Sequence, residues 1–204
     1  MSKKPIIVFE GIEGSGKTFH INNVVKFLKK KKIKYIKIRE PGGSSNAEKI
    51  RNLLMNKKSQ FHKFTDLLLY LAARNENYVS LLSKNVNKKV ILIDRFVDST
   101  IAYQHHGMGL DLNLINLLNK KILNNLKVDF TFLHIVKLQN LRSRLKKRKK
   151  LNRYDKFNDS FYKKAQKGFI KLSKSKRKYM IINSNKSIIS NKKNIISQII
   201  KLVL

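Results

Sequence analysis

The feature that most constrains the fold is a glycine-rich run with the spacing G-x-x-x-x-G-K-[ST], made of Gly11, Ile12, Glu13, Gly14, Ser15, Gly16, Lys17 and Thr18. An apolar run, residues 5–9, precedes it, and residues 19–28 have the character of a helix. Glycines let backbone N–H groups converge on phosphate oxygens at the start of a helix, Lys17 can reach the β- and γ-phosphates, and the Thr18 hydroxyl can bind Mg²⁺. A chance glycine turn would not supply the motif, the strand and the helix together. The run therefore predicts a nucleoside triphosphate site.

Apolar runs and helical segments alternate through the rest of the chain. The expected strands after the first are residues 33–38, 90–95, 130–135 and 179–183, and the expected helices are residues 47–55, 63–83, 98–104, 111–125, 161–175 and 194–204. No linker or repeat interrupts this order. The pattern predicts one α/β domain over residues 1–204, a three-layer P-loop NTPase fold with a parallel sheet of about five strands flanked by helices.

The charge of the chain is unusual, with 46 basic and 12 acidic residues and a formal net charge of +34. Such a charge can indicate a nucleic acid or membrane partner. However, the basic residues are mostly lysines spread over the whole chain, and Lys, Asn and Ile all have A/T-rich codons. Base composition is thus the simpler explanation, and we expect neither a specific nucleic-acid partner nor a membrane partner. The chain has no cysteine and no apolar leader, so a cytoplasmic protein without thiol chemistry is expected.

Charged and aromatic residues cluster where the predicted strands end. The strand 90–95 closes on Asp94, the expected second acid of a P-loop enzyme, which would hold Mg²⁺ through water. The strand 33–38 ends at an Arg-Glu-Pro-Gly-Gly turn, residues 39–43, at the edge where open parallel sheets bind ligands. Tyr70 and Arg74 share one helix face and could stack on and hydrogen-bond a flat base, or could be a core Tyr with a surface Arg. The basic stretch 138–155 is typical of a mobile lid over the triphosphate.

Five separate motifs carry a resemblance to bacterial thymidylate kinases, members of the P-loop nucleoside monophosphate kinase superfamily. They are Phe9-Glu10-Gly11 with the glycine-rich run, Arg39-Glu40-Pro41-Gly42-Gly43, Ala72-Ala73-Arg74, Asp94-Arg95-Phe96 and Ser99-x-x-Ala102-Tyr103-Gln104. The glycine-rich run is common to many NTPases, whereas the second and the last two motifs are much more specific. Together they occur in the right order over most of the chain.

The resemblance implies transfer of the ATP γ-phosphoryl group to dTMP, giving dTDP and ADP in dTTP biosynthesis, with Mg²⁺ as cofactor. It implies that Lys17 and the P-loop amides hold ATP, that Thr18, Asp94 and Glu10 serve the metal, and that Arg95, Arg39 and Arg51 hold the dTMP phosphate. Glu10 would also face the sugar 3′-hydroxyl, and the Glu40-Pro41 peptide would be cis. Tyr70 would stack on thymine, Arg74, Thr100 and Gln104 would read the base, and Tyr103 would crowd the 2′ position. Family members usually pair as homodimers.

The resemblance also locates the last positive charge in the lid. Some family members carry an arginine in the P-loop, whereas here Glu13 occupies that region and the lid holds Arg148 and Arg153. Lys17, Arg95 and one of these two lid arginines are therefore the expected catalytic cations. The lid departs from the usual Asp-Arg-x-Glu, because it reads Asn-Arg-Tyr-Asp at residues 152–155, and Met108 replaces a common arginine. Slower turnover or looser specificity could follow.

Three other functions remain open at this level. One is a different monophosphate kinase or a deoxynucleoside kinase with the same fold. The second is a nucleic-acid-binding ATPase that uses the +34 charge. The third is a degenerate non-catalytic relative, which the presence of Lys17, Thr18, Asp94 and Arg95 disfavours.

Overall fold

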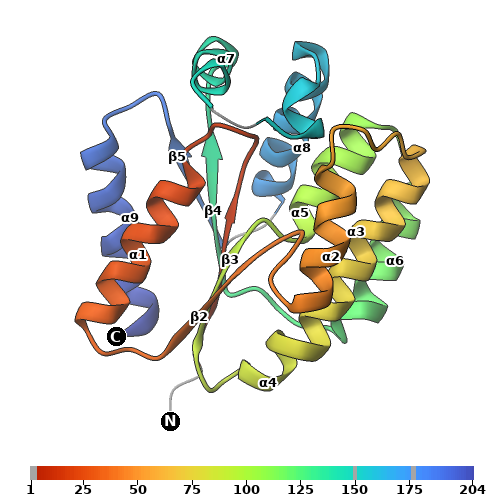
Figure 1. The fold of residues 1–204 in the computed structure, drawn as a ribbon. Coiled ribbons are helices and arrows are strands. Elements are labelled where there is room, and N and C mark those ends of the chain that lie inside the picture. The colour runs from red at the N-terminus through yellow and green to blue at the C-terminus, as the bar shows by residue number, and fades with distance from the viewer. Residues whose placement is uncertain (1–3, 149–150, 176–177) are drawn as a thin grey trace.

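A parallel β-sheet forms the centre of the computed structural model, which describes residues 4–148, 151–175 and 178–204. Within these residues, five strands pair in the order β2-β3-β1-β4-β5 (Figure 1). The strands are β1 (Ile6–Glu10), β2 (Tyr35–Arg39), β3 (Val90–Asp94), β4 (Phe130–Ile135) and β5 (Tyr179–Asn183). Each neighbouring pair is parallel, and Val8 in the central strand lies opposite Ile93 on one side and Thr131 on the other. The predicted fold class is confirmed.

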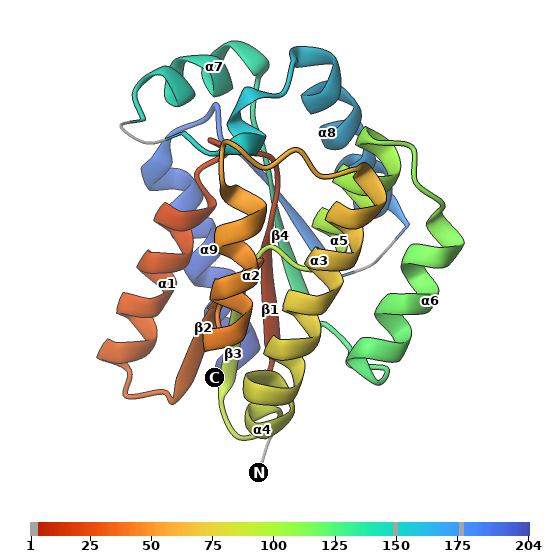
Figure 2. The same ribbon diagram turned by 45° about the vertical axis from the view of Figure 1, so that its right-hand side comes forward.

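Helices cover both faces of this sheet (Figures 1 and 2). On one face lie α1 (Lys17–Lys30) and α9 (Ile188–Val203). On the other lie α2 (Ser45–Met55), α3 (Lys63–Asn77), α4 (Ser83–Asn85), α5 (Val97–Thr100), α6 (Leu112–Leu123) and α8 (Asp159–Lys174). The helix α7 (Leu138–Lys146) lies beyond the carboxyl end of β4. No helix in the described part of the chain is both long and apolar enough to cross a membrane.

The alternation of side chains along β1 explains why both faces are apolar. Ile7 and Phe9 pack with Val24 of α1 and Ile195 of α9 in one buried cluster. The intervening Val8 belongs to the cluster on the opposite face. Because successive side chains of a strand point to opposite faces, a strand covered on both sides must be apolar throughout. All residues of β1 and β3 are buried, as the uninterrupted apolar runs predicted.

Three helical segments differ from the expectations. The predicted helix 63–83 is α3 followed by a π-helical segment, Tyr78–Leu82, and by α4. The predicted helix 98–104 begins as α5 and continues as a longer π-helical segment, Ile101–Gly107. The last helix begins at Ile188 and not at residue 194, because the Ser187 side chain accepts a hydrogen bond from the Ser190 N–H and caps it.

Candidate active site

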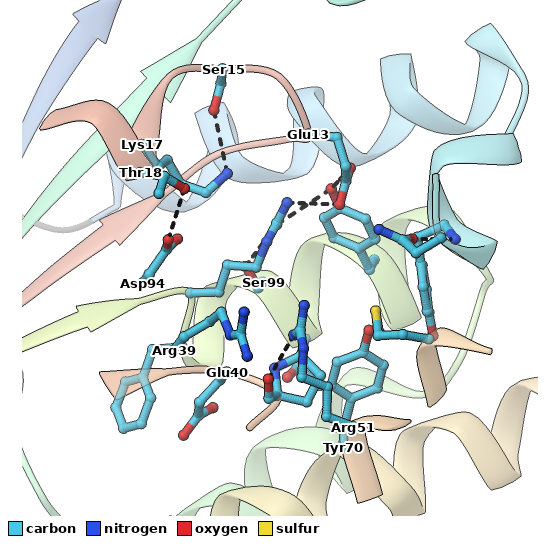
Figure 3. Close-up of a pocket in the computed structure, with 18 of the residues that line it drawn as sticks. Glu13, Ser15, Lys17, Thr18, Arg39, Glu40, Arg51, Tyr70, Asp94 and Ser99 are labelled. Atoms are coloured by element: carbon cyan, nitrogen blue, oxygen red, sulfur yellow. Dashed lines mark hydrogen bonds and ion pairs between the residues drawn. The ribbon is translucent and has the colours of Figure 1, made fainter. Parts of the chain in front are cut away.

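Most of the predicted site residues line one cavity of about 480 Å³ at the carboxyl ends of β1, β2 and β3. Figure 3 shows Lys17, Thr18 and Asp94 on one side of this cavity and Arg39, Arg51 and Tyr70 on another. Ligands of open parallel sheets bind at this edge. The lining includes Glu13, Gly14, Ser15, Gly16, Lys17, Thr18, Arg39, Glu40, Pro41, Arg51, Tyr70, Arg74, Asp94, Arg95, Thr100, Tyr103, Gln104 and Arg148.

The P-loop adopts a conformation that requires glycine. Gly11 has φ +133°, and a Cβ atom there would lie 2.2 Å from the His134 carbonyl oxygen. The Lys17 ammonium donates hydrogen bonds to the carbonyl oxygens of Gly11 at 2.7 Å and Ile12 at 2.9 Å. Burial, with a contribution from the positive charge of Arg95, lowers the pKa of Lys17 to about 7. An anion beside this ammonium would favour its charged form.

Two oxygen side chains that suit Mg²⁺ lie side by side at the P-loop. The Thr18 hydroxyl donates to Asp94 Oδ2 at 3.3 Å, and the Asp94 residue is 7% exposed. Magnesium in kinases is usually held by one or two such side chains together with substrate phosphates and water. No cluster of three or more metal-ligating side chains occurs among the described residues. The Thr18–Asp94 pair thus fits a phosphate-bound Mg²⁺.

Glu10 lies beneath the cavity and is absent from its lining. Its carboxylate accepts hydrogen bonds from the Phe96 N–H at 2.8 Å and from the Ser99 N–H at 3.2 Å and hydroxyl at 2.5 Å. Burial, reinforced by the negative charge of Asp98, raises the pKa of Glu10 to about 7. In this structure Glu10 fixes the start of the segment that carries Arg95 and Ser99.

A cluster of three side chains joins the P-loop to the opposite wall. The Arg95 guanidinium donates to Glu13 Oε1 at 2.7 Å and lies 5.2 Å from the centre of the Tyr103 ring. The Tyr103 hydroxyl donates to the second oxygen of Glu13. The backbone of Arg95 lies in the left-handed region, with φ +69°. Non-glycine residues in this region are strained and cluster at ligand sites. The sequence marked Glu13 only as a P-loop residue, and this pairing was not predicted.

Two further arginines of the predicted phosphate grip are Arg39, the last residue of β2, and Arg51 on α2. Arg39 is half exposed and donates to both Glu48 carboxylate oxygens, at 3.0 and 3.1 Å. Arg51 donates to the Pro41 carbonyl oxygen at 2.7 Å. The Glu40–Pro41 peptide is cis, as predicted. Both arginines line the cavity, and these hydrogen bonds to Glu48 and Pro41 hold their side chains in place.

Arg74 and the adjacent polar residues form the far end of the cavity. The Arg74 side chain is 1% exposed, pairs with Glu40 at 2.8 Å and donates to Asn119 Oδ1 at 2.6 Å. By contrast, Thr100 Oγ1 and Gln104 Nε2 are buried and have no hydrogen-bond partner among the described residues. Buried polar atoms normally have partners. Thr100 and Gln104 line the same cavity as Tyr70, so these two atoms mark a place where a polar ligand edge would fit.

The two lid arginines point to different surroundings. Arg148 lines the cavity, and its guanidinium donates to Asp155 Oδ1 at 2.8 Å. Arg153 lies outside the lining and pairs with Asp66 of α3. Of the two predicted candidates, Arg148 alone is brought to the cavity. Residues 149 and 150 of the predicted lid lie outside the described residues.

Several lining residues were not predicted, among them Lys37, Ser99, Asn152 and Tyr154. Ser99 precedes the predicted Thr100 within one motif, so that motif could have indicated it. Asn152 and Tyr154 flank Arg153 in the predicted lid and could have been included on that ground. Lys37 carries no sequence signal, because lysines are frequent throughout the chain.

Comparisons with known proteins agree with this site. Residues 9–195 match the family model described as thymidylate kinase. The chain is 34% identical over 196 residues to a thymidylate kinase of Sulfurihydrogenibium sp., with 95% of each protein covered. It is 36% identical over 183 residues to one of Thermosipho africanus, covering 89% of this chain and 90% of that protein.

A crystal structure extends the likeness to the fold. The thymidylate kinase of Ehrlichia chaffeensis superimposes with a TM-score of 0.78 at 29% identity, covering 97% of this chain and 99% of that one. The family model spans more than half of the chain, and the relatives match over nearly its whole length. This chain belongs to the thymidylate kinase family.

Proposed function

We propose that this cavity transfers the γ-phosphoryl group of ATP to dTMP, the reaction of the family to which the chain belongs, in dTTP biosynthesis. The observation that carries the proposal is the meeting, in one cavity, of the P-loop, five arginines and a recess with two polar atoms that have no partner among the described residues. A kinase needs such a cavity, because phosphoryl transfer depends on positioning two anions and neutralising their charge. We also propose that residues 1–204 form one kinase domain, with residues 138–155 as its lid.

The donor phosphates would bind at the P-loop. The backbone N–H groups of residues 13–18 would surround them, and the Lys17 ammonium would leave the two carbonyls that it contacts to reach the β- and γ-phosphates. An ATP phosphate restores the positive charge of Lys17, whose pKa lies near 7 without a ligand. Thr18 and Asp94 would hold Mg²⁺, which neutralises the charge of the phosphate oxygens.

The acceptor would lie between β2, α3 and the segment that follows β3. Arg95, partly buried and directed by Glu13, would bind the dTMP phosphate together with Arg39 and, more weakly, Arg51. Arginine suits this task because its planar fork of donors matches phosphate oxygens. The pairing of Arg39 with Glu48 and of Arg51 with a carbonyl would hold both guanidinium groups ready at the cavity.

The recess beyond these cations would take the nucleoside. Tyr70 would stack on thymine, while Thr100 Oγ1 and Gln104 Nε2 would gain the base as their missing partner. Arg74 would face the base from its pair with Glu40. Tyr103, fixed by Glu13 and by the Phe161 ring 5.6 Å away, would occupy the space of a ribose 2′-hydroxyl. Glu10, held by Phe96 and Ser99, would act from beneath the site on metal-bound water or on the sugar 3′-hydroxyl.

The lid would supply the last cation. Arg148 is the lid arginine that lines the cavity, and Asp155 orients its guanidinium. We assign it the role of stabilising charge on the transferring phosphoryl group, as arginine fingers do in other phosphoryl-transfer enzymes.

A panel of acceptors tests the substrate. ADP release, coupled to pyruvate kinase and lactate dehydrogenase, is measured with dTMP, dUMP, dCMP, dGMP and thymidine. We expect dTMP to give the highest kcat/KM. A clear preference for dCMP, dGMP or thymidine would assign the fold to another nucleoside or nucleotide kinase. ATP hydrolysis that needs DNA or RNA and no nucleotide acceptor would instead favour the nucleic-acid-binding ATPase.

A homodimer is the second part of the proposal. The helices α2 and α3 pack side by side, and α6 is the neighbour of α3 (Figure 2). All three helices carry exposed apolar side chains. They are Leu53, Phe64, Leu68 and Leu117, each 39% to 57% exposed. Exposed apolar side chains on neighbouring helices favour association. Light scattering should give twice the chain mass, and Leu68→Lys should shift it to the monomer; an unchanged dimer would exclude this face. The cytoplasmic location and the lack of a nucleic-acid partner stay predictions.

A further inference from the structure

A buried acid on α3, Asp66, contacts the lid and has no role in the site described so far. Asp66 is 3% exposed and accepts hydrogen bonds from Arg153 at both carboxylate oxygens. The Tyr154 hydroxyl donates to Asp66 Oδ2 at 2.8 Å. Because the Arg153 side chain is itself only 15% exposed, this pair is shielded from solvent. Such an ion pair, once formed, is costly to break.

The same short turn of the lid also holds Arg148. Asn152 caps the turn Arg153–Lys156 by accepting from the Tyr154 and Asp155 N–H groups, and Asp155 Oδ2 accepts from the Asn152 N–H at 2.9 Å. The other oxygen of Asp155 accepts from Arg148. The turn is therefore closed by a reciprocal capping box. The side chains at 152 and 155, which depart from the family pattern, form this box together.

The ring of Tyr154 links the turn to the acceptor recess. It packs edge-on against Tyr70, with ring centroids 5.9 Å apart, and against Tyr103 at 6.4 Å. Tyr70 is one helical turn beyond Asp66 on α3, so both contact the lid from the same side of the helix. The Tyr154 carbonyl oxygen also accepts from the Tyr162 hydroxyl of α8 at 2.7 Å. The turn is thus fixed between α3 and α8.

We propose that Asp66 is a positioning residue for Arg148. By holding Arg153 and Tyr154 on α3, it fixes the turn whose Asp155 directs the Arg148 guanidinium into the cavity. The inference rests on the proposed role of Arg148 in phosphoryl transfer. It predicts that loss of Asp66 lowers kcat through Arg148. A buried ion pair that served stability alone would change the free energy of unfolding without an effect on kcat that depends on Arg148.

Limited trypsin digestion tests the contact without catalysis. The exposed Lys146 and Lys147 end α7 next to Arg148 and are natural cleavage sites. We expect Asp66→Ala to be cut there about tenfold faster than the unaltered protein, because cleavage follows the population of the opened lid. Glu76→Gln is the matched control, because Glu76 is an acid on the same helix whose carboxylate accepts a hydrogen bond from Asn46. Equal cleavage rates in Asp66→Ala and the control would overturn the inference.

A double-variant cycle tests the kinetic consequence. Asp66→Ala should lower kcat about 10- to 100-fold with little change in the KM for ATP, and Asp66→Asn, which keeps an acceptor for Tyr154, should lose less. In an Arg148→Ala background the added loss should fall below about threefold, because the two residues act through one contact. Where Asp66→Ala folds poorly, Arg153→Met removes the same pair from the lid side.

The outcomes separate the inference from the function on which it rests. If the fold-loss of kcat in the double variant equals the product of the two single losses, Asp66 acts independently of Arg148. That result would overturn the inference but not the proposed function. A loss confined to the KM for dTMP would also overturn it, since the effect would then pass through Tyr70. An unchanged kcat in Arg148→Ala would overturn the proposed role of Arg148 itself, and the inference with it.

Discussion

Replacing Arg74 by Met should cost about 3–5 kcal/mol of unfolding free energy, because it leaves the Glu40 carboxylate buried without its partner. The pair is almost completely shielded, with side chains 1% and 4% exposed. Met fills most of the volume of the arginine stem, so the loss reports mainly on the charge and on the hydrogen bond to Asn119. For a chain of this length, such a loss corresponds to a fall in Tm of about 6–20 °C.

The pH dependence provides a second signature of the same change. Burial raises the pKa of Glu40, and the Arg74 charge opposes this. Without Arg74 the folded-state pKa of Glu40 rises further above its unfolded value. A carboxyl with a raised folded pKa keeps its stabilising contribution at low pH and loses it as the pH rises through that pKa. The deficit of Arg74→Met should therefore grow between pH 5 and pH 8.

Urea unfolding followed by far-UV circular dichroism measures both effects. Arg142→Met is the matched control, because Arg142 pairs with Asp159 at the surface, where side chains are 35% and 54% exposed, and should cost less than about 1 kcal/mol. The double variant Arg74→Met with Glu40→Gln should recover more than half of the loss. A loss equal to that of the control, or a double variant no more stable than the single one, would refute this reasoning.

Three further predictions concern the lid, the buried acid and a helix contact. Arg148→Ala should lower kcat about 10³-fold or more, and Arg153→Ala clearly less, as measured by ADP release; the opposite order would move the role to Arg153. The Glu10 carboxyl, with a pKa raised to about 7, loses its stabilising contribution in the unaltered protein as the pH rises from 5 to 8. The difference in unfolding free energy between Glu10→Gln and the unaltered protein should therefore shift in favour of Glu10→Gln over this range, as urea titrations at both pH values would measure. Gly168→Ala should lower stability by about 1–3 kcal/mol in thermal unfolding, because its Cβ would lie 2.4 Å from the His106 ring; an unchanged Tm would contradict the packing.

The sequence was sufficient to predict most of the fold, because strands buried on both faces must be apolar throughout. The runs that became β1 and β3 therefore stood out from the lysine-rich helices. The start of α9 was missed because Lys192 and Lys193 fall within its exposed face and resemble a loop. The π-helical segment that carries Tyr103 has no local signal either. It forms where the segment packs against α8, a contact distant in sequence.

The site was predictable where a motif fixes a residue type, and less so where a partner decides its role. Lys17 and Thr18 meet Asp94 because β1, which leads into the P-loop and α1, pairs with β3, which ends at Asp94. The pairing of Glu13 with Arg95 joins residues far apart in the chain, and no spacing rule indicates it. In the same way, no sequence feature distinguished Arg148 from Arg153. Only the tertiary structure places Arg148 at the cavity and Arg153 against Asp66 of α3.

The most direct test of the account follows the phosphoryl group itself. The protein is incubated with dTMP, Mg²⁺ and ATP labelled with radioactive phosphorus at the γ position, and the products are separated by chromatography. The account predicts that the label appears in dTDP, that it requires dTMP, and that Lys17→Ala abolishes it. Label released mainly as inorganic phosphate, or transferred to thymidine and not to dTMP, would contradict it.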